Sequence, residues 1–293
     1  MFDSMAQAVA VAAERQISLG ELALQRESEQ GTRSRAAVEA GLARALEVMR
    51  EARARGLLGD VRSVSGLVGG DAHRLAVSER GPLRGTVLAS ALAGALAVQE
   101  VNAAMGVIVA APTAGAAGVL PGVLLGLADR APSRDATVLV RALAAAGLCG
   151  AVIAQRATLS GAEGGCQAET GAAAAMAAVA GVELLGGTPA EAAQALALAM
   201  QGTLGLVCDP VGGLVEVPCV FRNATAAAIA LAGIEMAMAG VQIPIPADEI
   251  IDAMAEIGRT MDARYRETAG GGLAATPTGR RLARGRLGPT RGG

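Results

Sequence analysis

The near absence of aromatic side chains constrains the fold of this chain more than any other feature. Its 293 residues include only Phe2, Phe221 and Tyr265 from that class, together with 40 glycines. The core must therefore be built from closely packed Ala, Leu, Val and Gly. Small residues let helix backbones approach one another. Together with long stretches of helical periodicity, this composition predicts an all-α fold, a compact Ala/Gly-rich helical domain with Gly/Pro-rich loops.

Helical signals recur along most of the chain. Val38, Leu42, Leu46 and Met49 recur at helical spacing and predict one buried face. The sequence Thr188-Pro189-Ala190-Glu191 is a capping box with proline at the first helical position. No strand-rich region and no repeat is evident. We expect helices over residues 4–16, 35–55, 85–105, 135–158, 170–185, 189–201 and 220–239, and a last clear helix beginning at residue 246.

The length is sufficient for a sizeable core. We expect N-terminal helices over residues 1–60 that are continuous with a helical domain over residues 61–280. The Arg/Gly-rich tail, residues 281–293, is expected to be disordered.

Charge and composition exclude several classes of function. The net charge is −2, which gives no indication of nucleic-acid binding. All 25 basic residues are arginine. A chain without lysine can form neither the Schiff base of pyridoxal phosphate chemistry nor a P-loop.

The mean hydropathy of +0.44 could suggest membrane spans. Most of the apolar residues are alanine, however, and polar side chains interrupt the two most apolar runs, at Gln99, Glu100, Asn102 and Arg141. We therefore expect that the protein is not associated with a membrane. The N-terminus shows no signal-peptide pattern. The four cysteines of the chain are then expected to be reduced thiols in the cytoplasm, available to bind metal.

Three of the cysteines, Cys166, Cys208 and Cys219, lie in Gly- or Pro-rich loops beside polar residues, with the spacing C-x41-C-x10-C. Widely spaced cysteines are also common core residues, so spacing alone leaves both interpretations open. The loop setting favours an iron–sulfur cluster with three protein ligands and one open iron, because glycine leaves backbone N–H groups free to approach cluster sulfides. Cys149 lies in an apolar helical run and is expected to be a core residue.

Two further loops could bind an anionic ligand. Ser63, Ser65 and Gly66 could offer hydroxyls and backbone N–H groups, although an ordinary loop leading into a helix fits equally well. Thr113 is placed to cap a helix whose exposed N-terminus could bind a carboxylate, or it could be a structural cap.

These residues together resemble the α subunit of bacterial iron–sulfur L-serine dehydratase, or L-serine ammonia-lyase. The resemblance covers about residues 63–279. It rests on S-x-S-G-L-x-G-G-D at 63–71, a Gln99-led version of N-E-V-N-A-A-M-G at 99–106, A-P-T-A-G-A-A-G at 111–118, S-G-A-E-x-G-C-Q-x-E at 160–169, C-D-P-V-x-G-L-V-x-V-P-C at 208–219 and A-T-P-T-G at 275–279.

The resemblance implies that Cys166, Cys208 and Cys219 hold a [4Fe-4S] cluster and that no pyridoxal phosphate is used. It implies β-elimination of water from L-serine to give pyruvate and ammonia, with the open iron as Lewis acid. An oxygen-sensitive carbon–nitrogen lyase is therefore expected. The expected substrate-binding residues are Ser63, Ser65, Gly66, Asn102, Thr113, Ala114, Gly115, Arg222 and Asn223.

The general base is not identified by the sequence. The family's Ser-Ser-Ser-His-Thr motif, carried on its other domain, is absent here. A separate β subunit, in a heterotetramer or larger assembly, is expected to supply the base, with His73 as the secondary candidate. Three alternatives stay open: a related cluster-dependent lyase that acts on L-cysteine (a desulfidase), a non-catalytic iron–sulfur protein, and a membrane carrier with broken helices.

Overall fold

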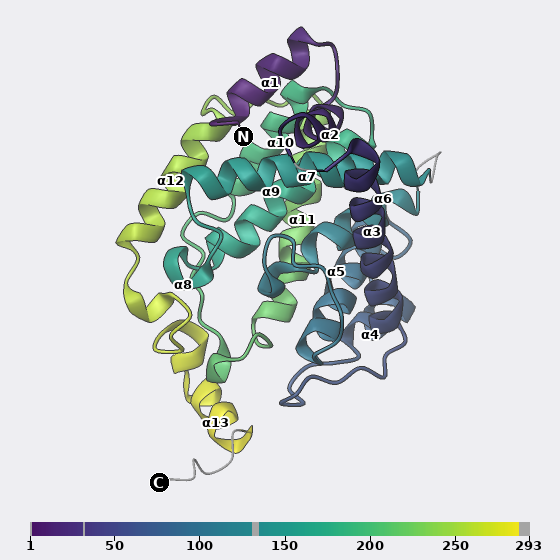
Figure 1. The fold of residues 1–293 in the computed structure, drawn as a ribbon. Coiled ribbons are helices and arrows are strands. Elements are labelled where there is room, and N and C mark those ends of the chain that lie inside the picture. The colour runs from purple at the N-terminus through teal and green to yellow at the C-terminus, as the bar shows by residue number, and fades with distance from the viewer. Residues whose placement is uncertain (1, 32, 131–134, 287–293) are drawn as a thin grey trace.

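The computed structural model describes residues 2–31, 33–130 and 135–286. Within these ranges the chain is built from helices and connecting loops, and no strand is formed (Figure 1). The predicted all-α class is confirmed. The only extended pairing found there is an isolated bridge between Cys208 and Arg266.

The bounds of the α-helices are α1 Met5–Glu14, α2 Leu19–Gln30, α3 Arg35–Leu57, α4 Asp71–Val77, α5 Val87–Ala103, α6 Val119–Ala128, α7 Ala136–Arg156, α8 Gly161–Gly164, α9 Ala172–Leu184, α10 Pro189–Gln201, α11 Cys219–Met238, α12 Ala247–Thr260 and α13 Pro277–Arg286. The helices predicted by range, which are α1, α3, α5, α7 and α9 to α12, lie within a few residues of their predicted positions, and the described ranges contain further, mostly shorter helices.

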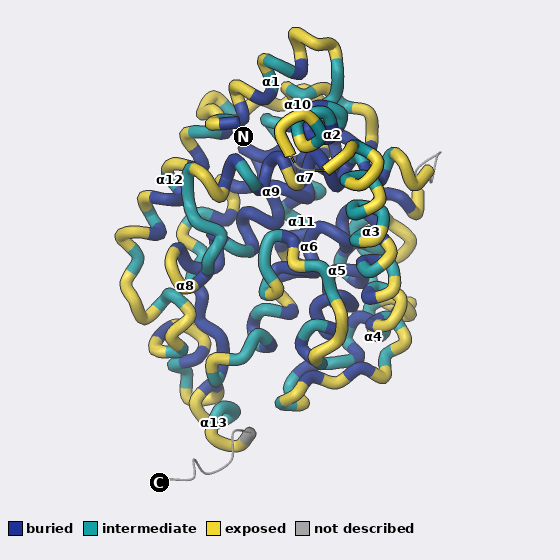
Figure 2. Tube along the Cα trace, viewed as in Figure 1, coloured by how far each residue is buried: buried dark blue, intermediate teal, exposed yellow. Residues whose placement is uncertain are grey.

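Helix α9 is the centre of the fold. All of its residues are buried, and α6, α7, α10 and α11 pack around it (Figures 1 and 2). Its sequence, AAAAMAAVAGVEL, explains this position, because a helix that is hydrophobic on every face belongs in an interior. Exposed residues gather instead on the outer helices, such as α3 and α12 (Figure 2).

The predicted close approach of helices is seen where glycines face neighbouring backbones. A Cβ atom on Gly122 of α6 would lie 2.7 Å from the amide nitrogen of Ala95 in α5. A Cβ atom on Gly56 of α3 would lie 2.2 Å from the carbonyl oxygen of Ala97 in the same helix α5. Helix α5 is therefore held between α3 and α6 at distances that only glycine permits.

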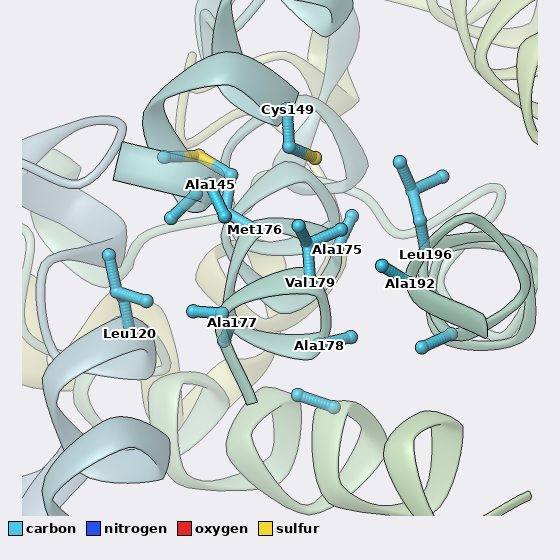
Figure 3. Packing of buried hydrophobic residues seen from close by; sticks show 14 of the residues in the cluster. Leu120, Ala145, Cys149, Ala175, Met176, Ala177, Ala178, Val179, Ala192 and Leu196 are labelled. Carbon is cyan, nitrogen blue, oxygen red and sulfur yellow. The ribbon is translucent and has the colours of Figure 1, made fainter. Parts of the chain in front are cut away.

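Cys149 of α7 is a core residue, as predicted. Its side chain is fully buried among alanines, leucines and Met176 at the contact between α7 and α9 (Figure 3). Burial raises the pKa of its thiol.

The N-terminal helices share the main core. Met5, Leu22, Leu46 and Met49 belong to the same buried cluster as α9. Val38 and Leu42 pack against that cluster at its edge, so the predicted buried face of α3 is confirmed. The carboxylate of Asp248, at the start of α12, accepts the backbone N–H groups of Met5 and Ala6 at 2.8 and 3.0 Å. The first helix is thereby fixed to α12, late in the chain.

Two helices differ from expectation. Helix α2 was not predicted, because its sequence LGELALQRESEQ is mostly polar. Its N-terminus is capped by Ser18, and its buried Leu19, Leu22 and Leu24 lie where the helix packs on α7. The predicted disordered tail is wrong for residues 281–286, which continue α13; residues 287–293 lie outside the described residues. Helix α13 begins with proline at residue 277, where a missing N–H costs nothing.

Helices α7 and α11 are long and apolar enough to cross a membrane, by length and composition only. Both pack against other helices of this fold, and core helices pass the same test. The expected absence of a membrane stays a prediction.

Candidate active site

The three loop cysteines come from three separate segments at one end of α9. Cys166 lies between α8 and a π-helical turn, Gln167–Gly171, that leads into α9. Cys208 lies in the loop after α10, and Cys219 is the first residue of α11. Cys166 and Cys208 are buried, whereas Cys219 is half-buried.

Gln167 joins the first two cysteine loops. Its fully buried amide donates to the carbonyl oxygens of Gly164 and Met254, both at 3.0 Å, and accepts the N–H of Gly205 at 2.9 Å. The backbone N–H of Gln167 also donates to the carbonyl of Leu206, at 3.0 Å. These bonds hold the loop before Cys166 against the loop before Cys208 and against α12.

The backbone of Cys208 is held by a later segment of the chain. Its N–H donates to the carbonyl of Tyr265 at 2.8 Å, and its carbonyl accepts the N–H of Glu267 at 2.9 Å. The neighbouring Asp209 carboxylate accepts the N–H of Leu273 at 2.6 Å. The second cysteine loop is thus fixed by residues that follow α12.

Arg222 provides the positive charge beside the thiols. It lies in the first turn of α11, with Nη1 2.7 Å from Oδ1 of Asp209 and donating to the carbonyl of Val207 at 2.8 Å. Burial raises the pKa of Cys166 and of Cys219, and the guanidinium of Arg222 opposes that rise in both thiols. Arg222 therefore lies at the cysteines, as the sequence predicts, and also braces the second cysteine loop.

The three thiols influence one another. Burial raises the pKa of each one, and that of Cys219 reaches about 12. Negative charge on Cys166 raises the pKa of the other two, which places all three in one electrostatic neighbourhood. The Thr170 hydroxyl, with Oγ1 2.9 Å from the sulfur of Cys166, opposes the effect of burial on that thiol.

A site for one metal ion is not formed: in the described ranges, no three His, Cys, Asp or Glu side chains are gathered closely enough to hold a single ion. The three thiols nevertheless converge from separate loops, since the charge of Cys166 raises the pKa of both Cys208 and Cys219. A bound metal would replace the thiol protons that burial retains.

Glu169 lies beside the thiols on the π-helical turn. Its side chain is half-buried, and burial raises its pKa; the Thr113 hydroxyl lowers that pKa and the Glu267 carboxylate raises it. A Cβ atom on Gly161 would lie 2.6 Å from Oε2 of Glu169 and 3.4 Å from the sulfur of Cys208. The carboxylate and this thiol therefore both lie next to the backbone of Gly161, where no side chain intervenes.

The segment from Thr113 to Gly118 forms a site wall, but not the predicted capped helix. Residues Ala114–Ala116 form a short 3-10 turn, and the Thr113 side chain makes no capping bond. The N–H of Gly118 donates to Oδ1 of Asn223 at 2.9 Å, so this amide is already satisfied inside the protein. The N–H of Gly118 is therefore not free for a ligand, and binding of a carboxylate by this segment stays a prediction.

Side-chain amides also fix this segment, by donating to its carbonyl oxygens. Asn223 donates to the carbonyl oxygens of Gly115 and Cys219 at 2.8 and 2.9 Å. Gln99 donates to those of Ala114 and Gly115, both at 3.2 Å, and Asn102 donates to that of Ala114 at 2.9 Å. Of the predicted substrate-binding residues, Asn102 and Asn223 thus hold the wall that contains Thr113, Ala114 and Gly115.

The loop that contains Ser63, Ser65 and Gly66, here called the serine loop, binds a carboxylate of the chain itself. Glu216, from the second cysteine loop, accepts the hydroxyl of Ser63 at 2.6 Å, the backbone N–H of Ser65 at 3.0 Å and the hydroxyl of Ser65. The predicted anion-binding chemistry is present, but an internal residue occupies it. A role of Ser63, Ser65 and Gly66 in substrate binding stays a prediction.

The glycines that follow bind a second internal carboxylate. Glu100 is almost fully buried and accepts the N–H groups of Gly70, Asp71 and Ala72 at 3.0, 2.7 and 3.2 Å. Burial raises its pKa in spite of these three donors, which act in the opposite direction. Glu216 and Glu100 together fix the loop from residue 63 to residue 72.

His73 is committed to a local contact. Its Nδ1 lies 2.9 Å from the carbonyl oxygen of Leu57, and its ring packs against Gly59. This anchors α4 to the end of α3. Its role as the secondary candidate for the base stays a prediction.

Comparison with known proteins gives the site its context. The family described as serine dehydratase alpha chain matches residues 14–274, which include every site residue named above. The chain belongs to the serine dehydratase alpha chain family.

Relatives at high identity agree. A probable L-serine dehydratase alpha chain of Bacillus subtilis is 47% identical over 285 residues, covering 96% of this chain and 94% of the relative. The L-serine dehydratase alpha chain of Peptoniphilus asaccharolyticus is 47% identical over 200 residues, 68% of each chain. L-serine dehydratase TdcG of Escherichia coli is 40% identical over 260 residues, which cover 84% of this chain and 56% of that longer protein.

In this serine dehydratase alpha chain family member, several polar residues that complete the site were not predicted. They are Gln167, Glu169, Asp209, Glu216 and Glu100. One signal was available: each is a polar or charged residue inside an apolar or glycine-rich stretch, and buried polar groups need partners. Most of those partners lie far away in the sequence, as Ser63 lies 153 residues from Glu216, and local patterns do not identify them.

Proposed function

We propose that this chain is the α chain of an iron–sulfur L-serine dehydratase, which converts L-serine to pyruvate and ammonia by β-elimination of water. The convergence of Cys166, Cys208 and Cys219 at one end of α9 carries the proposal, because it provides a cofactor site in a chain without lysine. Family membership and the printed names of the relatives support the reaction.

These three cysteines would hold a [4Fe-4S] cluster. When bound by three protein thiolates, such a cluster supplies a Lewis-acidic iron with an open coordination position. The residues present fit such a cluster. The thiols lie close enough to shift one another's pKa, Arg222 offsets thiolate charge, and the glycine-rich loops leave backbone N–H groups accessible.

The chain's own residues would position the substrate. The wall at Thr113, Ala114 and Gly115 is held rigid by three amide side chains, so its exposed backbone is preorganised. At the start of the 3-10 turn, the N–H groups of Ala114 and Gly115 have no acceptor within the turn and suit a substrate carboxylate. Arg222, one-sixth exposed, adds positive charge nearby.

The base that removes the α-proton is expected to come from a separate β chain. The alpha-chain designation of the relatives supports an enzyme of more than one chain. His73 serves a local structural contact and is the weaker candidate.

The test is anaerobic reconstitution with iron and sulfide, followed by measurement of the visible spectrum and of pyruvate formed from L-serine, with and without the β chain. We expect a cluster and β-dependent pyruvate. A cluster without pyruvate would exclude L-serine as the substrate and direct the search to L-cysteine, for which sulfide release is the assay.

Single variants test the ligand assignment. Cys166→Ala, Cys208→Ala and Cys219→Ala are each expected to lose the iron content and the visible absorption of the wild-type protein. Cys149→Ala is the matched control and should retain both, because its thiol is enclosed in the helical core. A full cluster in Cys208→Ala would refute the assignment.

A further inference from the structure

Among the residues that the structure describes, the carboxylate of Glu169 differs from the other enclosed acids because it has neither an arginine partner nor a set of backbone donors. Glu183 pairs with Arg141 at 2.9 Å and Asp209 with Arg222 at 2.7 Å. Glu100 and Glu216 each receive three donors from the chain. In the described part of the chain, no arginine forms an ion pair with Glu169, and the charged group that acts on it is another carboxylate, Glu267.

Glycines leave both oxygens of Glu169 uncovered. A Cβ atom on Gly115 would lie 3.2 Å from Oε1 and 3.3 Å from Oε2, and one on Gly161 would lie 2.6 Å from Oε2. The site wall and the first cysteine loop thus approach the carboxylate with bare backbone. The Thr113 hydroxyl acts on this carboxylate but makes no hydrogen bond of normal geometry with any described residue.

A structural role does not account for this arrangement. The first cysteine loop is already tied down by Gln167, and the second by Asp209 and Arg222. A half-buried carboxylate without a partner is unfavourable, and a cationic ligand would relieve that cost.

We propose that Glu169 binds the α-ammonium group of the amino acid substrate and so selects amino acids over hydroxy acids without an amine. The inference rests on the proposed function of this site. The substrate is then held between two charges of the chain: the ammonium group at Glu169, and the carboxylate at the N–H groups of the site wall and the positive charge of Arg222.

The experiment compares Glu169→Gln with the wild type as reconstituted enzyme with its β chain. Glutamine keeps the size and one acceptor but loses the charge. We expect the KM for L-serine to rise about tenfold or more, the loss typical of a charge-assisted hydrogen bond, with a smaller change in kcat. The inhibition constant of 3-hydroxypropanoate, which has the hydroxyl and carboxylate but no amine, should change less than about twofold.

An equilibrium measurement gives a readout independent of turnover. L-alanine retains the ammonium group but has no leaving hydroxyl, and its binding can be titrated anaerobically by calorimetry. Glu169→Gln should weaken its binding by a factor similar to the change in KM. Iron content and visible spectrum establish that the variant carries its cluster.

Glu163→Gln is the matched control. Glu163 lies in the preceding short helix, α8, and is exposed; its carboxylate accepts the hydroxyl of Thr158 at 2.6 Å. Its variant should keep the wild-type KM.

Two results would overturn the inference: an unchanged KM in Glu169→Gln, or a fall in kcat with unchanged KM and unchanged L-alanine binding, which would assign Glu169 to proton transfer. Absence of pyruvate from the wild-type enzyme would instead refute the proposed function, and the L-alanine titration would still decide the role of Glu169.

Discussion

Replacement of Asn223 by alanine should be one of the most destabilising single changes near the site. The side chain is fully buried on the first turns of α11 and makes three hydrogen bonds, to Gly118, Gly115 and Cys219, at 2.8–2.9 Å. Alanine would leave the N–H of Gly118 and the carbonyl of Gly115 without these partners.

The magnitude follows from these contacts. Each hydrogen bond contributes about 1 kcal/mol net, so about 3 kcal/mol is lost, and the higher helix propensity of alanine returns roughly 0.5 kcal/mol. We expect the free energy of unfolding to fall by about 2–3 kcal/mol. Urea unfolding of the metal-free chain, followed by circular dichroism, would measure this from the shift in midpoint at constant m-value.

Asn102→Ala is the control for this experiment. Asn102 is also a helical asparagine that donates to the same wall, but it is half-buried and makes a single hydrogen bond, to the carbonyl of Ala114 at 2.9 Å. Its variant should lie within about 0.5 kcal/mol of the wild type, because one hydrogen bond and one gain in propensity nearly cancel. Equal effects of the two variants would refute the reasoning.

Three further predictions concern packing, pH and oxygen. Gly56→Ala should destabilise the fold, because its Cβ atom would lie 2.2 Å from the Ala97 carbonyl oxygen. Gly147→Ala, on the exposed face of α7 with no atom within 4 Å of the new Cβ, should stabilise the fold by about 0.5–1 kcal/mol. Thermal unfolding should therefore shift the midpoint in opposite directions for the two variants, and shifts of the same sign would contradict the packing argument. Because burial raises the pKa of Glu100 above 4.5, its contribution to stability is present below that pH and is lost as the pH rises through the folded-state pKa. The difference in unfolding free energy between the wild type and Glu100→Gln should therefore decrease from pH 4 to pH 8, and a constant difference in urea unfolding would contradict this. The reconstituted enzyme should lose activity in air, since an iron with an open position is accessible to oxidants; undiminished pyruvate formation after hours of exposure would argue against the proposed cofactor.

Much of the fold could be predicted from local signals. The capping box at Thr188 and Glu191 fixes the start of α10, and both of its reciprocal bonds are formed. The apolar face at Leu46 and Met49 is buried as expected. Helix α2 escapes prediction because most of its side chains are polar and its buried residues lie only in its first turns, where contact with α7 determines its position.

The site could be predicted only in part, for a physical reason. The cysteines are visible in the sequence because thiols in glycine-rich loops are uncommon in an apolar helical chain. The sequence also indicates that the serine loop can bind an anion, but the occupant of that loop, Glu216, is 153 residues away from Ser63. Such pairings follow from the three-dimensional arrangement of helices, which no local pattern encodes.

The second cysteine loop has a consequence for the order of assembly during synthesis. Its Glu216 needs Ser63 and Ser65, while Cys208 and Asp209 are held by backbone from residue 265 to residue 273. The thiols therefore acquire their final arrangement only after residue 273 has left the ribosome. Loading of a cofactor at this site would follow that step, and a chain that stops before residue 273 would present its cysteines as separate, unassembled thiols to the cell.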